Sequence, residues 1–179
     1  MSPGTDTLYQ ANLALLARAG IAFDEYLHEP VFSYATAEQV RTRFGLSGRE
    51  SKSLFLRLKD GRYCLFLTLQ GRRLDAGRLK ALLGSRPALC SDAELTAQTG
   101  CLPQCACPFG HAAEIILVVD RAVLEGGSLL YSPGPPDRSI EIAAADLPAL
   151  LACCSNPLLF YDGQPPPLGT CPPTVPFPA

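Results

Sequence analysis

The sequence lacks the two common signals of a membrane or exported protein. No apolar run approaches the ~20 residues of a membrane-spanning helix. The first ten residues, MSPGTDTLYQ, have neither the basic start nor the apolar stretch of a signal peptide. We therefore expect a soluble, cytoplasmic protein with no membrane partner. A length of 179 residues suits one domain with a hydrophobic core.

Histidine is scarce, and common motifs of hydrolases and nucleotide-binding proteins are missing. His28 and His111 are the only two histidines, and there is no G-x-S-x-G elbow. Neither a P-loop nor a G-x-G-x-x-G loop occurs. A serine-hydrolase triad therefore has little support, and we expect no cofactor.

Lysine is also scarce, with three lysines against twelve arginines. Lys59 lies in a predicted turn and Lys80 on a predicted helix, which are ordinary solvated places. Lys52 stands at the start of the apolar strand SKSLFLRL. There it is either an exposed strand-edge residue or a point charge with rotatable donors, available to a ligand.

The charge is distributed unevenly along the chain. The net charge of −2 argues against a free-standing nucleic-acid binder. Residues 41–86, however, hold twelve of the fifteen basic residues and only three acids, a net charge of +9. This segment forms either a positive face that engages phosphates or a solvated hairpin and helix surface.

Periodicity and turn signals predict a mixed α+β domain around a largely antiparallel sheet. Thr36 and Gln39 fit a capping box, and Asp75 and Asp146 stand where helices begin. Two hairpins are predicted, around Asp60-Gly61 and around PGPPD at 133–137. The predicted helices span 7–19, 36–44, 75–83, 91–98 and 146–154, and the predicted strands span 52–58, 63–69, 114–120, 128–132, 138–142 and 158–161.

The end of the chain differs in composition from the rest. Eight of the last twenty-four residues are proline, which neither a sheet ladder nor a helix interior accepts. We place the domain at residues 1–155 and a proline-rich tail at 156–179, with a short strand at LLFY. The tail packs on the body, recruits a partner or is loose.

Residues 98–111, QTGCLPQCACPFGH, hold three of the eight cysteines. Cys101, Cys105 and Cys107 form a metal site only if Cys153-Cys154 or His111 adds a ligand, and zinc usually takes paired knuckles. A redox switch would need an exposed thiol of low pKa. Reduced cysteines acting as small buried hydrophobes are the third interpretation.

Four stretches together resemble the YbaK/ProX family of trans-editing aminoacyl-tRNA deacylases, which are related to the editing insertion of prolyl-tRNA synthetase. They are HEPVFSYATAEQV, SKSLFLRLKDGRYCLFLTL, RRLDAGRLKALLG and TGCLPQCACPFG followed by EIILVVD. The resemblance spans roughly residues 8–154. It implies a mixed, curved sheet with flanking helices and a central pocket.

The resemblance also implies a function and a site. The function is hydrolysis of the ester that joins a wrong, small amino acid to a tRNA, often tRNA(Pro). The implied partners are the tRNA acceptor end and, as a candidate, prolyl-tRNA synthetase. The implied catalytic residue is Lys52, no metal is involved, and the expected substrate-binding residues are Tyr26, His28, Pro30, Gln104, Cys105, Ala106, Cys107, Pro108, Gly110, Ser132, Gly134 and Ser139.

The expected chemistry needs no triad, because an aminoacyl ester is already activated. The enzyme has to position a water molecule and stabilise the developing oxyanion, for which backbone N–H groups suffice. In the family the terminal ribose hydroxyl of the tRNA is thought to assist the water. Lys52 would then hold the phosphate or ester end.

Two positions depart from the family pattern. Gln104 stands where the family usually has glycine, and the second loop, SPGPPDRS, is rich in proline. Both changes fall where the amino acid is selected. They leave a second hypothesis open, a catalytically weak module of the same fold that binds tRNA or a synthetase.

Overall fold

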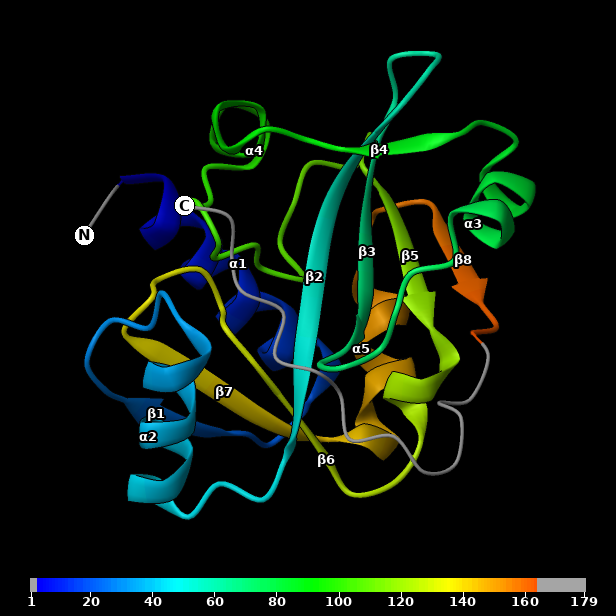
Figure 1. Cartoon of the computed structure of the whole chain (residues 1–179). Helices are drawn as coiled ribbons and strands as arrows, with labels where there is room; N and C mark the ends of the chain where they lie inside the picture. Colours follow the sequence, from blue (N-terminus) through cyan, green and yellow to red (C-terminus); the bar gives the residue numbers. More distant parts are fainter. Residues whose placement is uncertain (1–2, 164–179) are drawn as a thin grey trace.

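The computed structural model describes residues 3–163, which form a mixed α+β fold (Figure 1). The helices are α1 (Pro3–Ala19), α2 (Tyr34–Phe44), α3 (Ala76–Leu83), α4 (Asp92–Thr99) and α5 (Leu147–Cys153), with short 3-10 helices η1 (Arg121–Leu124) and η2 (Ala144–Asp146). The strands are β1 (Asp24–Leu27), β2 (Arg49–Leu58), β3 (Tyr63–Leu69), β4 (Pro87–Leu89), β5 (Ile116–Asp120), β6 (Ser128–Tyr131), β7 (Arg138–Ala143) and β8 (Leu158–Tyr161).

One mixed sheet organises these elements, which confirms the predicted fold class. Its strand order is β1-β7-β6-β2-β3-β5-β8, and β4 pairs with β2 off this path. The two predicted hairpins are antiparallel, as is the β1–β7 pair. The contacts β2–β6, β3–β5 and β5–β8 are parallel. The sheet is therefore less antiparallel than the sequence suggested, and β4 was not predicted.

The core lies on both faces of the central strands. Along β3, Leu65 and Leu67 face the cluster beneath α1 and α5, whereas Cys64 and Phe66 face the cluster beneath α3. Because side chains alternate along a strand, an unbroken apolar run such as YCLFLTL buries both faces. A smaller cluster around Val40 holds α2 against β6.

The helix ends follow the capping rules, with one correction. The Asp75 side chain accepts hydrogen bonds from the Gly77 and Arg78 N–H groups, as predicted. The predicted capping box at Thr36 is wrong, because α2 begins two residues earlier and Ser33 is its N-cap. Ser33 accepts the Thr36 N–H, which places Thr36 inside the first turn.

Both ends of the described chain pack against the rest of the domain. Helix α1 begins four residues earlier than predicted and buries Leu8 and Leu16. Strand β8 forms at LLFY as predicted and pairs in parallel with β5, so the sheet extends to Tyr161. The proline-rich part of the predicted tail, from residue 164, lies outside the described residues. None of the helices in 3–163 has the length and apolar character needed to cross a membrane.

Candidate active site

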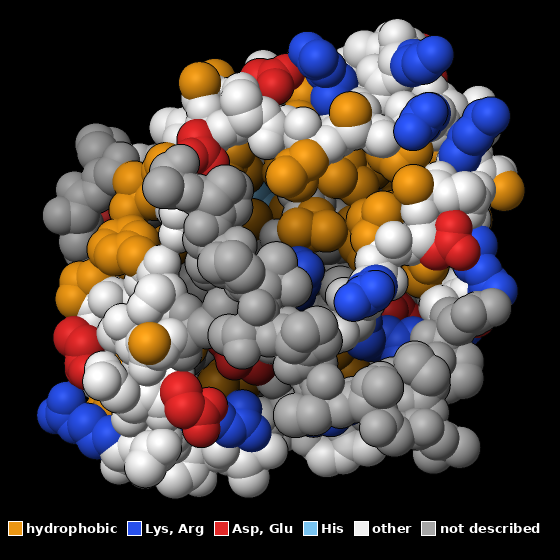
Figure 2. Space-filling model, viewed as in Figure 1, with side chains coloured by type: hydrophobic (Ala, Val, Ile, Leu, Met, Phe, Trp, Pro, Cys, Tyr) orange, Lys and Arg blue, Asp and Glu red, His pale blue; other side chains and the backbone are white. Residues whose placement is uncertain are grey.

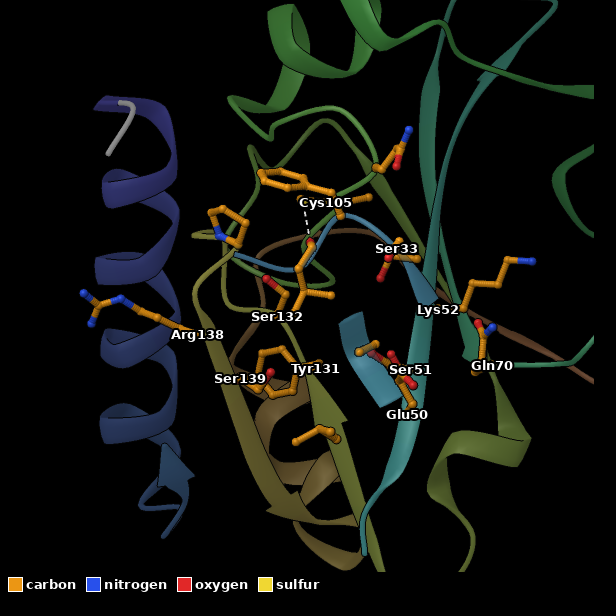
Figure 3. Close-up of a pocket in the computed structure, with 18 of the residues that line it drawn as sticks. Ser33, Glu50, Ser51, Lys52, Gln70, Cys105, Tyr131, Ser132, Arg138 and Ser139 are labelled. Carbon is orange, nitrogen blue, oxygen red and sulfur yellow. Dashed lines mark hydrogen bonds between the residues drawn. The ribbon is translucent and has the colours of Figure 1, made fainter. Parts of the chain in front are cut away.

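A cavity of about 480 Å³ opens beside β2. Its walls are β2, the segment that enters α2, the loop after α4, and the turn between β6 and β7 (Figure 3). Figure 2 shows apolar side chains gathered around a hollow on this face of the molecule. The cavity brings together, from distant parts of the chain, the predicted site residues His28, Lys52, Gln104, Cys105, Ala106, Ser132 and Ser139.

The other predicted residues do not line the cavity: Tyr26, Pro30, Cys107, Pro108, Gly110 and Gly134. Tyr26 packs on the ring of Phe44 beneath α2, and its hydroxyl donates to Glu141 at 3.3 Å. Cys107 is completely buried.

A single buried asparagine on α1 bonds to two loops at the cavity: the cysteine-rich loop between α4 and β5, and the β6–β7 turn. Asn12 is 1% exposed, and its amide Nδ2 lies 3.1 Å from the Phe109 carbonyl oxygen. The same atom lies 3.3 Å from the Pro133 carbonyl oxygen and 3.3 Å from the Cys107 sulfur. Asn12 thus joins the cysteine-rich loop to the β6–β7 turn. A buried amide keeps such a position only when it is hydrogen-bonded.

The two glycines of these loops allow the close approach to α1. Gly110 has φ +87°, and a Cβ there would lie 3.1 Å from the side chains of Ala11 and Asn12. Gly134 has φ +132°, and a Cβ there would meet the Thr5 carbonyl oxygen at 2.9 Å. Both positions need glycine for backbone freedom and for space.

Cys101, Cys105 and Cys107, in the loop between α4 and β5, are packing residues. Burial raises the pKa of Cys107 to about 12 and that of Cys105 to about 11, and it also raises the pKa of Cys101. Such thiols hold little thiolate near neutral pH, which counts against a redox switch. Across residues 3–163, no group of three or more His, Cys, Asp or Glu side chains is arranged to hold a metal ion.

His111, the other candidate ligand, acts inside the loop. Its Nε2 lies 2.6 Å from the Cys107 carbonyl oxygen, so this nitrogen carries the proton and donates. Burial lowers the pKa of His111, and the carbonyl contact opposes that effect. The imidazole is therefore neutral, and its hydrogen bond to Cys107 stabilises the loop.

His28 and Ser139 form a polar pair on the cavity wall. The His28 Nδ1 lies 2.8 Å from the Glu29 carbonyl oxygen, which can only accept, so Nδ1 carries the proton. In the neutral ring Nε2 is then an acceptor, and it lies 3.0 Å from the Ser139 hydroxyl. The pair offers an oriented hydroxyl to a ligand.

Lys52 lies at the mouth of the cavity. Its side chain is on the side of Gln70 and points away from Cys105 and Ser132 (Figure 3). Within the described chain, no carboxylate forms an ion pair with it. The ammonium is thus free to meet an anionic part of a ligand that enters from outside.

Gln104 adopts a left-handed backbone conformation, which glycine reaches most easily. Its φ is +64°, and it is the only non-glycine residue with positive φ in the described chain. This left-handed conformation costs an L-residue roughly 1–2 kcal/mol. The loop therefore has at this position a backbone that glycine would favour, and the Gln104 side chain lines the cavity.

Substitutions at Gln104 test this strain. We expect Gln104→Gly to change the free energy of unfolding by less than about 1 kcal/mol, because relief of strain offsets the added chain entropy. Gln104→Val should destabilise the fold by about 1–3 kcal/mol, because a β-branched residue is poorly tolerated at positive φ. Urea unfolding of both variants measures the difference, and equal stabilities would contradict the observed backbone.

Sequence reasoning missed several residues of the site. Asn12 had a visible signal, because it is a polar residue at helical spacing between Leu8 and Leu16. Glu50 also lines the cavity, and burial raises its pKa while Arg41 opposes that effect. Nothing in the sequence places Glu50 at the cavity, since that depends on how α2 packs beside β2.

The fold and the cavity define a class of protein. A partly enclosed pocket with a largely apolar lining, a lysine at its mouth and backbone groups in its loops suits the end of a larger anionic molecule. The profile of the aminoacyl-tRNA editing domain matches residues 28–150. The chain belongs to this family, which confirms the resemblance to the YbaK/ProX proteins.

Individual relatives agree with this assignment. The multifunctional Ser/Thr-tRNA deacylase ProXp-y of Escherichia coli (strain K12) is 26% identical over 151 residues, covering 82% of this chain and 89% of the relative. The crystal structure of a proposed trans-editing enzyme for prolyl tRNA synthetase superposes with a TM-score of 0.68 at 22% identity, covering 92% of this chain and 99% of that one. A hypothetical protein of known structure gives 0.70 at 19% identity, covering 84% and 98%.

Proposed function

We propose that the chain hydrolyses the ester of a tRNA that carries a wrong, small amino acid, and that it acts in translation quality control. The observation that carries this proposal is the cavity itself, in a chain of the editing-domain family. The small side chains of Ser132, Ser139 and Ala106 on its wall support a small amino acid as the part that is bound there. A tRNA substrate supports a cytoplasmic location, which is part of this proposal.

The proposed mechanism uses the bound tRNA and the loops of the cavity. A water molecule attacks the ester carbonyl, the bond to the terminal ribose oxygen breaks, and that oxygen takes a proton. Backbone N–H groups stabilise the negative charge that develops on the carbonyl oxygen. Lys52, at the mouth, binds a phosphate of the tRNA end by a charge-assisted hydrogen bond. The Ser139 hydroxyl, oriented by His28, contacts the substrate.

Size selection by the cavity is tested with one tRNA carrying different amino acids. We expect rapid release of alanine, cysteine or serine from tRNA(Pro), and release of phenylalanine near the spontaneous rate. A rigid cavity rejects large side chains by steric exclusion, whereas it discriminates weakly among smaller ones. Equal rates for phenylalanine and alanine would rule out the cavity as the selective site.

A basic surface suits the tRNA acceptor stem. Lys59 and Arg62 lie in the β2–β3 turn, and contacts of this turn with Leu83 and Ser85 bring Arg86 beside them. Lys and Arg side chains gather over this region in Figure 2, at its upper right. Lys59 follows the last residue of β2 and lies seven residues after Lys52, about 23 Å at ~3.3 Å per residue. The stem would dock at the turn while its end enters the cavity.

Charge reversal at this turn should weaken tRNA binding. We expect Lys59→Glu and Arg86→Glu each to raise the Kd for uncharged tRNA, and to reduce the dependence of Kd on salt because fewer counterions are released. Arg121→Glu, the same charge change outside residues 41–86, is the control. Filter binding between 50 and 200 mM salt measures this, and identical Kd values for all variants would exclude the turn as a tRNA contact.

We also propose prolyl-tRNA synthetase as a partner. The net charge of −2 favours a small contact area with the tRNA, so that another protein would bring the tRNA to this chain. Adding the synthetase to the deacylation reaction should then lower the KM for tRNA(Pro). An unchanged KM would mean that the chain finds its tRNA alone.

A further inference from the structure

Strand β2 directs its backbone groups alternately to its two sides. At one end the Gln70 N–H donates to the Glu50 carbonyl oxygen at 2.8 Å, and at the other the Leu58 N–H donates to the Arg62 carbonyl oxygen at 2.8 Å. Bonds of an antiparallel ladder recur at every second residue. The even-numbered residues of β2 therefore bond to β3, and Ser53, an odd-numbered residue, directs its N–H and C=O away from β3.

On the side of β2 toward which the Ser53 backbone groups point, the middle of the strand has no neighbouring strand. Strand β6 pairs with β2 only at Arg49–Glu50, and β4 pairs only at Leu56–Leu58. Next to the gap, the Cys90 N–H donates to the Phe55 carbonyl oxygen, which confirms the direction of the odd-numbered groups. Within residues 3–163 no strand faces Ser53, and Ser53 lines the cavity.

We propose that the backbone of Ser53 is the docking edge for the aminoacyl group of the substrate. This inference rests on the proposed function. An aminoacyl ester carries a carbonyl oxygen, which accepts, and an α-ammonium group, which donates. The Ser53 N–H binds the former and the Ser53 C=O binds the latter, as an added strand would.

The Ser53 N–H is expected to contribute more to catalysis than the Ser53 C=O, because of the chemistry of the ester. Negative charge develops on the ester carbonyl oxygen during attack by water, and a fixed N–H donor stabilises that charge more than it stabilises the ground state. The donor comes from a strand rather than from a flexible side chain. It therefore needs no reorganisation when the charge appears.

Proline at position 53 tests the donor. Ser53→Pro removes the N–H but breaks no bond to β3, and an unpaired edge position accepts proline. We expect kcat/KM for the best small aminoacyl ester to fall about 100-fold, the typical loss for one oxyanion donor. Ser53→Ala keeps the N–H, and its hydroxyl has no partner in the described chain, so its loss should be at least tenfold smaller.

Amide hydrogen exchange tests the same edge in the wild-type protein. This test does not depend on whether Ser53→Pro folds. The Ser53 amide should exchange faster than the amides of Lys52 and Leu54, which lie in the β2–β3 ladder. An amide-linked, non-hydrolysable alanyl-adenosine should slow exchange at Ser53.

The outcomes separate the inference from the proposed function. Hydrolysis by wild type with equal losses in Ser53→Pro and Ser53→Ala, or no protection of Ser53 by the analogue, would overturn the docking edge and leave the deacylase. Protection of Ser53 without hydrolysis would keep the edge and overturn the deacylase. Neither hydrolysis nor protection would overturn both.

Discussion

Lys52→Ala is expected to lower kcat/KM for a small mischarged aminoacyl ester by about 10- to 100-fold while leaving the fold intact. A hydrogen bond to a charged group contributes about 1.5–3 kcal/mol, and each 1.36 kcal/mol corresponds to tenfold in rate. No ion pair of Lys52 would be broken within the described residues. Thermal unfolding should therefore be unchanged. Initial rates with radiolabelled aminoacyl-tRNA measure the effect.

Two further variants make this result specific. Lys80→Ala, which removes an exposed lysine of α3, should keep the wild-type rate. Lys52→Arg keeps the charge and should recover part of the activity if Lys52 binds a phosphate. A Lys52→Ala protein with the wild-type kcat/KM would exclude the catalytic role of Lys52.

The largest loss of stability is expected at Asp120, which is 2% exposed at the end of β5. Its carboxylate accepts from the Thr68 hydroxyl at 2.7 Å, from the Arg72 guanidinium at 2.8 Å and from the Ala122 N–H at 3.1 Å. Removing one member of a buried ion pair typically costs about 3–5 kcal/mol. Asp120→Ala should lower the free energy of unfolding by that amount, because these bonds join β3, β5 and η1.

Urea denaturation measures this loss, with Asp162→Ala as the control. Asp162 pairs with Arg121 at 3.0 Å, and both side chains are more than half exposed. Exposed ion pairs contribute little. A change at Asp120 no larger than that at Asp162 would show that the buried network does not stabilise the fold.

Local signals predicted most of the secondary structure, because each is decided within a few residues. The β2–β3 hairpin follows from two β-rich runs around Asp60-Gly61, and α3 follows from its Asp75 cap. The start of α2 was misplaced because Ser33 and Thr36 are both good caps, and local sequence does not choose between them. Strand β4 was missed because three residues next to a proline carry no periodic pattern.

The site was predictable only where a family resemblance named the residues. The resemblance supplied His28, Lys52 and Ser139, which the fold brings to one cavity. It did not supply Asn12 or the open edge at Ser53, since these depend on how α1 and β6 pack against distant segments. At Gln104 the departure from the family pattern suggested a changed loop, and the structure places this residue at φ +64°, a value that glycine favours. Asn12 on α1 bonds to Cys107 and Phe109 further along the same loop, so the fold and not the local preference of glutamine determines this backbone.

The deacylase assignment is tested most directly by the multiple-turnover release of amino acid from tRNA(Pro) mischarged with alanine, cysteine or serine. The wild-type chain, at a concentration well below that of the tRNA, should release at least one of these amino acids far faster than spontaneous hydrolysis. Release at the spontaneous rate for all three, by a folded protein that still binds the tRNA, would contradict the account and identify a binding module instead.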